Sequence, residues 1–133
     1  MGANPMQTIK AFKEAEEHKG PSLIIAYSPC IEQGIKKGMN CAQNEQKLSV
    51  ECGYNILMRY KDEKLTIDSK EPDFEKYREF LDGEVRYNSL KLKNKEEAEK
   101  LLEINKENAK KRYDYYKSLI SIEKGEENEP KNN

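Results

Sequence analysis

The sequence predicts an α/β fold, in which a buried parallel strand lies between helices and is followed by a helical extension. The apolar run Ser22–Tyr27 lies between Pro21 and Pro29 and shows no alternation of apolar and polar residues. Such a continuous run is typical of a strand covered on both faces, as in a parallel sheet. Segments with helical periodicity lie on both sides of the run, and a highly charged one forms the C-terminal part of the chain.

The first helix is expected to begin after Asn4 and to end before Gly20-Pro21. Asn4 is a suitable cap, Pro5 fits the first helical position, and Gln7 stands three residues after the cap. The helix would carry an apolar stripe formed by Met6, Ile9, Phe12 and Ala15.

A second helix is expected over residues 40–52, with Asn40 as its cap, Gln43 in the capping-box position and Gly53 as its stop. A strand over residues 55–60 follows, and Lys61–Lys64 is expected to turn the chain back into a short strand at residues 65–67.

Residues 73–122 are predicted to be a helical extension. One helical piece ends at Asp82-Gly83, and Asn94 caps a long charged helix. The thin apolar stripe of this long helix is typical of a helix lying on a larger body. The stripe consists of Ala98, Leu101, Leu102, Ala109, Tyr113, Tyr116 and Ile120.

These elements predict three parts: residues 1–72 as an α/β part, residues 73–122 as a helical extension, and residues 123–133 as a tail. The tail is acidic, rich in Asn and almost free of apolar residues, so we expect it to be disordered. A strand buried on both faces needs neighbours, and the chain offers only one good candidate. We therefore expect the missing strands to come from sequence that precedes Met1.

Composition excludes several classes of function. The 133 residues are 35% hydrophobic and 37% charged, and the mean hydropathy is -1.05. The 24 basic and 25 acidic residues are mixed along the chain, which argues against a nucleic-acid partner and gives no reason to expect a membrane partner. The longest apolar run is too short to span a bilayer. Three cysteines without close pairing indicate a reducing compartment, the cytoplasm.

Cys30 is the most informative single residue, because it stands in the turn that follows the predicted strand. Open α/β sheets bind their ligands at this end of the strands, and a following helix N-terminus would stabilise a thiolate. Three interpretations remain open: a small buried hydrophobe, a reactive thiol, or a metal or cluster ligand. Cys41 and Cys52 match no zinc spacing with Cys30, and we expect them to line the inner face of the second helix with Leu48.

Other chemistry-bearing patterns are missing from the sequence. We find no Gly-rich phosphate loop, nucleophile elbow or paired-carboxylate motif, and thus no candidate catalytic residue. His18 lies near the end of the first helix, where a histidine is most often solvated or interacts with the helix dipole.

Several segments, in order along residues 1–120, closely resemble pyruvate:ferredoxin (flavodoxin) oxidoreductases. The segments are Met1–Pro5, Gly20–Ile31, Gly34–Met39, Gly53-Tyr54, Arg59-Tyr60, Leu65–Pro72, Phe80–Tyr87 and Glu96–Lys117.

The resemblance implies that the chain is the C-terminal part of the family's thiamine-diphosphate-binding domain. The family decarboxylates pyruvate with thiamine diphosphate and Mg²⁺, forms acetyl-CoA from CoA, and passes electrons through three 4Fe-4S clusters to ferredoxin or flavodoxin. Cys30 matches the distant fourth ligand of the cluster nearest to thiamine, whereas Cys41 and Cys52 match no ligand position. The resemblance also implies a homodimeric parent, with the thiamine- and Mg²⁺-binding residues upstream of this chain.

Two other hypotheses remain. The chain would be a small docking module or split subunit of an oxidoreductase, using the edge of strand 22–27, or a stand-alone thiol redox protein that uses Cys30. In the first hypothesis, and as a fragment of the oxidoreductase, the isolated chain is expected to be inactive.

Overall fold

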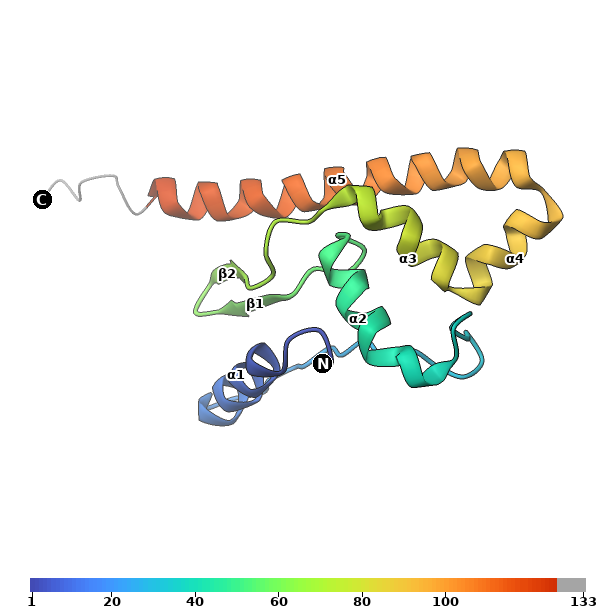
Figure 1. Cartoon of the computed structure of the whole chain (residues 1–133). Coiled ribbons are helices and arrows are strands. Elements are labelled where there is room, and N and C mark those ends of the chain that lie inside the picture. Colours follow the sequence, from blue (N-terminus) through green and yellow to red (C-terminus); the bar gives the residue numbers. More distant parts are fainter. Residues whose placement is uncertain (127–133) are drawn as a thin grey trace, which may run out of the picture.

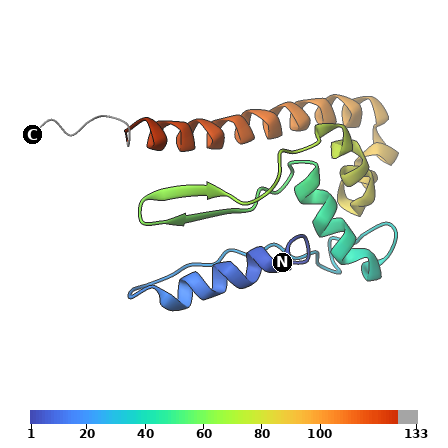
Figure 2. The same ribbon diagram turned by 60° about the vertical axis from the view of Figure 1, so that its left-hand side comes forward.

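The computed structural model describes residues 1–126, which form helices and one small sheet. The β-hairpin lies between α1 and the long helix α5, with α2, α3 and α4 gathered at one end (Figure 1; Figure 2). The elements are α1 (Pro5–Glu17), η1 (Met39–Cys41), α2 (Ala42–Glu51), β1 (Met58–Lys61), β2 (Lys64–Ile67), η2 (Phe74–Lys76), α3 (Tyr77–Gly83), α4 (Val85–Lys93) and α5 (Lys95–Glu126).

Two of the predicted helix starts are confirmed. The Asn4 side chain accepts a hydrogen bond from the Gln7 amide at 3.0 Å, and Pro5 is the first residue of α1. The Asn94 side chain likewise accepts from the Glu97 amide at 3.1 Å at the start of α5. In each case the side chain satisfies a backbone donor that the first turn leaves free.

The predicted cap of the second helix is wrong. Asn40 lies inside the 3₁₀ turn η1, so α2 begins only at Ala42, and the residue before it, Cys41, makes no capping bond with its side chain. The short turn takes the place of the first predicted helical turn, because its tighter i to i+3 bonds start the helix without an Asn cap. The predicted stop is confirmed: Gly53 follows α2 with a φ of 79°.

The predicted hairpin is also confirmed, although its first strand begins at Met58 and not at residue 55. β1 and β2 pair antiparallel, with Met58 opposite Ile67 and Lys61 opposite Lys64. Asp62 and Glu63 form the two-residue turn, and both have positive φ. Positive φ at both central residues defines the type I′ turn, whose twist matches that of the strands it joins.

The predicted buried strand is not formed among residues 1–126. Residues 22–27 are extended but pair with no strand, and Leu23 and Ile25 are 84% and 88% exposed. The hairpin is the sheet of the described part of the chain, so a mixed α/β composition is confirmed and a parallel sheet is not observed. Within residues 1–126 the strands form a two-stranded hairpin, and segment 22–27 is paired with neither of its outer edges, so its backbone groups lack the partner strand that a sheet requires.

The core lies between α2, α3 and α5. Its most buried side chains are those of Cys52, Phe80 and Ala109, with Leu48 and Tyr54 packed against them. The expected position of Cys52 on the inner side of α2 is therefore confirmed, whereas Cys41 is only half-buried, with its Sγ 4.0 Å from the Lys37 carbonyl oxygen. The core joins residues from both sides of the expected boundary at residue 72, and the division itself stays a prediction.

The long helix α5 packs on its own chain, against α4 and β2. It continues to Glu126, so the first residues of the predicted tail are helical, and residues 127–133 lie outside the described part of the chain. None of the helices within residues 1–126 combines the length and the apolar character that crossing a membrane requires.

Candidate functional site

Cys30 is exposed and opens a single tight turn. Its carbonyl oxygen accepts from the Gln33 amide at 3.1 Å and from the Gly34 amide at 3.0 Å. Gly34 then ends the turn with a φ of 71°, a conformation that glycine adopts without strain. No helix starts here, so the expected stabilisation of a Cys30 thiolate by a helix N-terminus is wrong: the next helical turn begins at Met39.

The end of this turn is fastened to the junction between α3 and α4. The Lys36 amide donates to the Gly83 carbonyl at 2.8 Å, and the Val85 amide donates to the Gly34 carbonyl at 3.3 Å. Ile35 and Glu84 thereby form an isolated antiparallel bridge. Backbone hydrogen bonds of this kind fix the position and orientation of the turn relative to the helical core.

Hydrogen bonds between side chains also hold this turn in place. The Gln33 side-chain amide donates to the Tyr27 hydroxyl at 3.2 Å and also to Glu84 Oε2. Glu84 is fully buried. Cys30 therefore stands midway between two residues, Tyr27 and Gln33, that are joined to each other and to a buried carboxyl group.

The electrostatics of this cluster favour neutral groups. Burial raises the pKa of the Glu84 carboxyl, and burial together with the charge of Glu84 raises the pKa of Glu45. The pKa of the Tyr27 hydroxyl is also raised by burial. Oε1 of Glu45 and Oε1 of Glu84 have no hydrogen-bond partner among residues 1–126. Glu45 lies directly on Gly83, where a Cβ atom would come within 2.6 Å of its Oε1.

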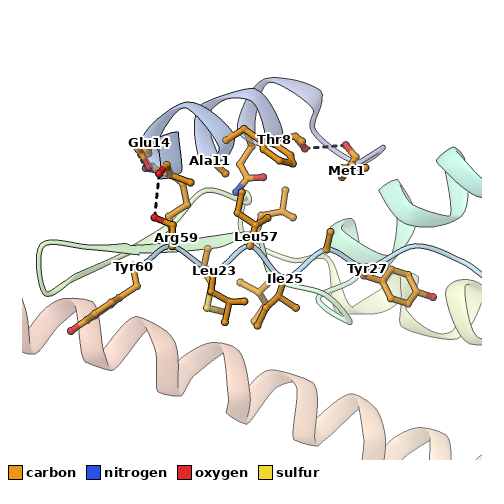
Figure 3. A pocket seen from close by; sticks show the side chains of 18 of the residues that line it. Met1, Thr8, Ala11, Glu14, Leu23, Ile25, Tyr27, Leu57, Arg59 and Tyr60 are labelled. Atoms are coloured by element: carbon orange, nitrogen blue, oxygen red, sulfur yellow. Dashed lines mark hydrogen bonds and ion pairs between the residues drawn. The ribbon is translucent and has the colours of Figure 1, made fainter. Parts of the chain in front are cut away.

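A groove of about 800 Å³ runs along the unpaired segment 22–27 and is lined by Tyr27 at the end nearest to Cys30 in the sequence. One wall is α1, through Thr8 and Ala11, and another is formed by Leu57 and the start of β1. Figure 3 shows Leu23 and Ile25 pointing away from α1, on the side where α5 lies.

Charged groups fix α1 at this groove. Arg59 of β1 donates to Glu14 of α1 at 2.6 Å and to Asp68 at 2.7 Å, and Figure 3 shows the pair with Glu14. Gln7 adds a bond to Asp68 at 3.1 Å. No residue of α1 is buried, and Met6 and Ile9 of its apolar stripe are 73% and 60% exposed.

The cysteines do not assemble a metal site of their own. Among residues 1–126 no three His, Cys, Asp or Glu side chains are grouped so that they could hold an ion, and none of the three thiols is in a disulfide. Burial raises the pKa of the Cys52 thiol to about 11, which disfavours the thiolate a metal needs. His18 is exposed at the end of α1. A complete cluster site does not fit these residues, whereas one exposed thiol fits a ligand shared with other polypeptide.

The polar residues around this turn could not be identified from the sequence. Gln33, Glu45 and Glu84 are three among many polar residues of a highly charged chain, and Glu84 is separated from Gln33 by 51 positions. Only their burial and proximity in the folded chain distinguish them.

No family model matches the chain. It is 44% identical over 128 residues to a pyruvate-flavodoxin oxidoreductase of Enterobacter agglomerans, and 45% identical over 126 residues to a pyruvate:ferredoxin oxidoreductase of Moorella thermoacetica. These matches cover 91% and 90% of this chain, but 11% and 10% of those proteins. A mitochondrial NADP(+) pyruvate dehydrogenase of Euglena gracilis is 36% identical over 124 residues, 88% of this chain and 7% of its own length.

The chain thus spans about a tenth of the length of the curated relatives it matches. At this identity over nine-tenths of its residues, it is homologous to a segment of these oxidoreductases.

Proposed function

We propose that this chain, homologous to a segment of pyruvate-flavodoxin and pyruvate:ferredoxin oxidoreductases, is the C-terminal part of such an enzyme and is inactive alone. The parent would convert pyruvate and CoA to acetyl-CoA and CO₂, with electrons passing through 4Fe-4S clusters to ferredoxin or flavodoxin. The identity to named oxidoreductases over nearly the whole chain, beside coverage of only a tenth of their length, carries this proposal.

Within the parent, the proposed role of Cys30 is to supply one thiolate to a 4Fe-4S cluster whose other ligands lie outside this chain. Its exposure on a turn held at 30–36 supports this role, because a ligand must be presented in a fixed place and still be reached from outside. A bound cluster would accept and pass on single electrons. Thiamine diphosphate and Mg²⁺ would be bound by residues beyond this chain.

The proposed role of segment 22–27 is that of a strand in a parallel sheet completed by the remainder of the parent. Its exposed Leu23 and Ile25 and its free backbone edge support this role, as do the uncovered side chains of Met6 and Ile9 on α1. Exposed apolar side chains beside an unpaired strand edge are typical of a surface that another polypeptide covers. We place the parent in the cytoplasm, where free thiols persist, and expect it to be a homodimer.

The experiment is a chimera in which this chain replaces the homologous segment of the Moorella thermoacetica enzyme. The chimera should reduce ferredoxin in the presence of pyruvate and CoA. Cys30→Ser should lower the iron content by one cluster's worth, whereas the control Cys41→Ser should leave it unchanged. Full iron content in Cys30→Ser would refute the ligand role, and an inactive chimera with normal cofactor content would count against the proposed function.

A second candidate is a docking module or split subunit, which the exposed edge of segment 22–27 favours. Expressing the chain separately from the remainder of the Moorella enzyme distinguishes the two. Co-purification of two separate polypeptides as an active complex supports a split subunit, and activity only in the fused chimera supports a covalent part.

A further inference from the structure

The turn that carries Cys30 depends on one buried side chain from a distant part of the chain. Glu84, at the junction of α3 and α4, accepts from the Gln33 side chain, which also donates to the Tyr27 hydroxyl. Tyr27 and Gln33 stand three residues before and three residues after Cys30. One carboxyl group thus connects both flanks of an exposed thiol.

The cost of burying Glu84 argues that it does more than fill space. Its side chain is fully buried, yet Oε1 finds no partner among residues 1–126. A buried carboxyl group with an unpaired oxygen destabilises a fold, and an apolar side chain of the same size would pack the junction better. The neighbouring carboxyl of Glu45, also buried, adds to this cost.

We propose that Glu84 is a positioning residue, which sets the place and direction of the Cys30 thiol by holding Tyr27 and Gln33 together. The main-chain bonds from Lys36 to Gly83 and from Val85 to Gly34 fix only the far end of the turn. The near end, at Tyr27, reaches the helical core through the Gln33 side chain and Glu84. Removing that carboxyl frees the segment that enters the turn.

The first test uses the full chain and needs no cluster. Glu84→Ala and Gln33→Ala each remove the hydrogen bond between these two side chains. The first variant removes its buried acceptor, and the second removes its partly exposed donor. Both should increase amide hydrogen exchange at Gly34, whose amide donates to the Cys30 carbonyl at 3.0 Å, about tenfold, the effect of one lost buried hydrogen bond. Glu84→Gln keeps an acceptor for Gln33 and should exchange like the parent chain.

Two further measurements keep this test decisive. Glu32→Ala, a matched control, removes an exposed carboxyl from the same turn and should change nothing. The Gln33 side-chain amide resonances should lie apart from those of other glutamines in the parent chain and in Glu84→Gln, and return to ordinary values in Glu84→Ala. Unchanged exchange in both Gln33→Ala and Glu84→Ala would overturn the proposal.

The consequence for the cluster rests on the proposed function, and the chimera separates the two. Gln33→Ala and Glu84→Ala should shift the midpoint potential and the electron paramagnetic resonance signal of one cluster, and Glu84→Gln should restore both. Loss of iron in Cys30→Ser without any change in Gln33→Ala and Glu84→Ala would overturn the positioning role alone. Full iron in Cys30→Ser would overturn the ligand role and leave the exchange result to decide the positioning of the turn.

Discussion

At the scale of single residues, Gly53 shows how one backbone conformation joins two parts of the core. Its φ is 79°, and a Cβ atom would lie 2.8 Å from Cε1 of Phe74 and 2.9 Å from Cβ of Pro72. Its carbonyl oxygen and that of Tyr54 accept from Arg112 of α5, at 3.3 and 2.7 Å. The residue that ends α2 is thus also where the long helix is attached.

Gly53→Ala should lower the free energy of unfolding by about 2 kcal/mol or more, since the left-handed conformation alone costs a non-glycine residue roughly 1–2 kcal/mol. Urea denaturation followed by circular dichroism measures the change. The control is Gly20→Ala, in an exposed loop without positive φ, which should stay within about 0.5 kcal/mol of the parent. Equal stability of the two variants would contradict this role of Gly53.

Arg59 is the second residue with a testable role, because its ion pairs attach α1. Its hydrogen bonds lower the pKa of Asp68 and of Glu14. A carboxyl group with a lowered pKa stabilises the fold above its unfolded pKa, and this stabilisation is lost as the pH falls through the folded pKa. The loss should therefore occur below about pH 4, the ordinary range of these groups.

Arg59→Met should flatten the dependence of the melting temperature on pH in this acid range, because the two carboxyl groups then titrate nearly as in the unfolded chain. Melting curves recorded from pH 6 down to pH 2.5 measure the slope. The matched change Lys19→Met, at an exposed position, should keep the slope of the parent chain. An unchanged slope in Arg59→Met would show that these ion pairs contribute nothing to stability.

At the scale of elements, the hairpin holds its turn without a glycine. Asp62 and Glu63 have φ of 51° and 63°, the region that an Asn-Gly or Asp-Gly pair occupies at least cost. Glu63→Gly creates the preferred pair and should stabilise the hairpin by roughly 0.5 kcal/mol, after the entropy that glycine loses on folding is subtracted. Slower amide exchange at the paired residues of β1 and β2 would show it. Glu63→Ala retains a Cβ atom, so a gain of the same size in that variant would exclude relief of backbone conformation as the cause.

The long helix α5 shows what periodicity can predict about an element and what it cannot. Its stripe predicted a helix lying on a larger body, and Leu102, Ala109 and Tyr113 are indeed buried. The body is the chain's own α4 and β2, together with the core beneath them. Periodicity identified the face that is covered, and only the arrangement of the other elements identified what covers it.

At the scale of the whole molecule, stability should be uneven. The core joins α2, α3 and α5, whereas α1 has no buried residue and segment 22–27 finds no partner strand within residues 1–126. Regions with few buried contacts open at low free energy. The two ends of the molecule should therefore differ in amide exchange.

In the isolated chain, amides of segment 22–27 should exchange within seconds, while those of α2 and α3 should be protected at least a hundredfold more, about 3 kcal/mol. Hydrogen exchange read by mass spectrometry compares the two directly. In the chimera with the Moorella enzyme, segment 22–27 should become protected as its neighbours pair with it. Strong protection of 22–27 in the isolated chain would contradict both the open edge and its proposed completion.

Much of the local structure could be predicted because local chemistry decides it. Asn4 and Asn94 cap their helices through bonds to amides three residues on, and Gly53 ends α2 because glycine tolerates positive φ. The prediction failed at Asn40, where a 3₁₀ turn replaced the cap, and for segment 22–27, whose pairing depends on strands that residues 1–126 do not offer.

The sequence by itself determined the starts of α1 and α5, the stop of α2 and the hairpin turn, and it singled out Cys30, since these signals act over a few neighbouring residues. Only the tertiary structure decided that Gln33 meets Glu84 across 51 positions, that Glu84 is fully buried, and that Arg59 joins α1 to the hairpin. The physical reason is that such contacts are fixed by how separate elements pack, and no property of either partner in the sequence specifies the other.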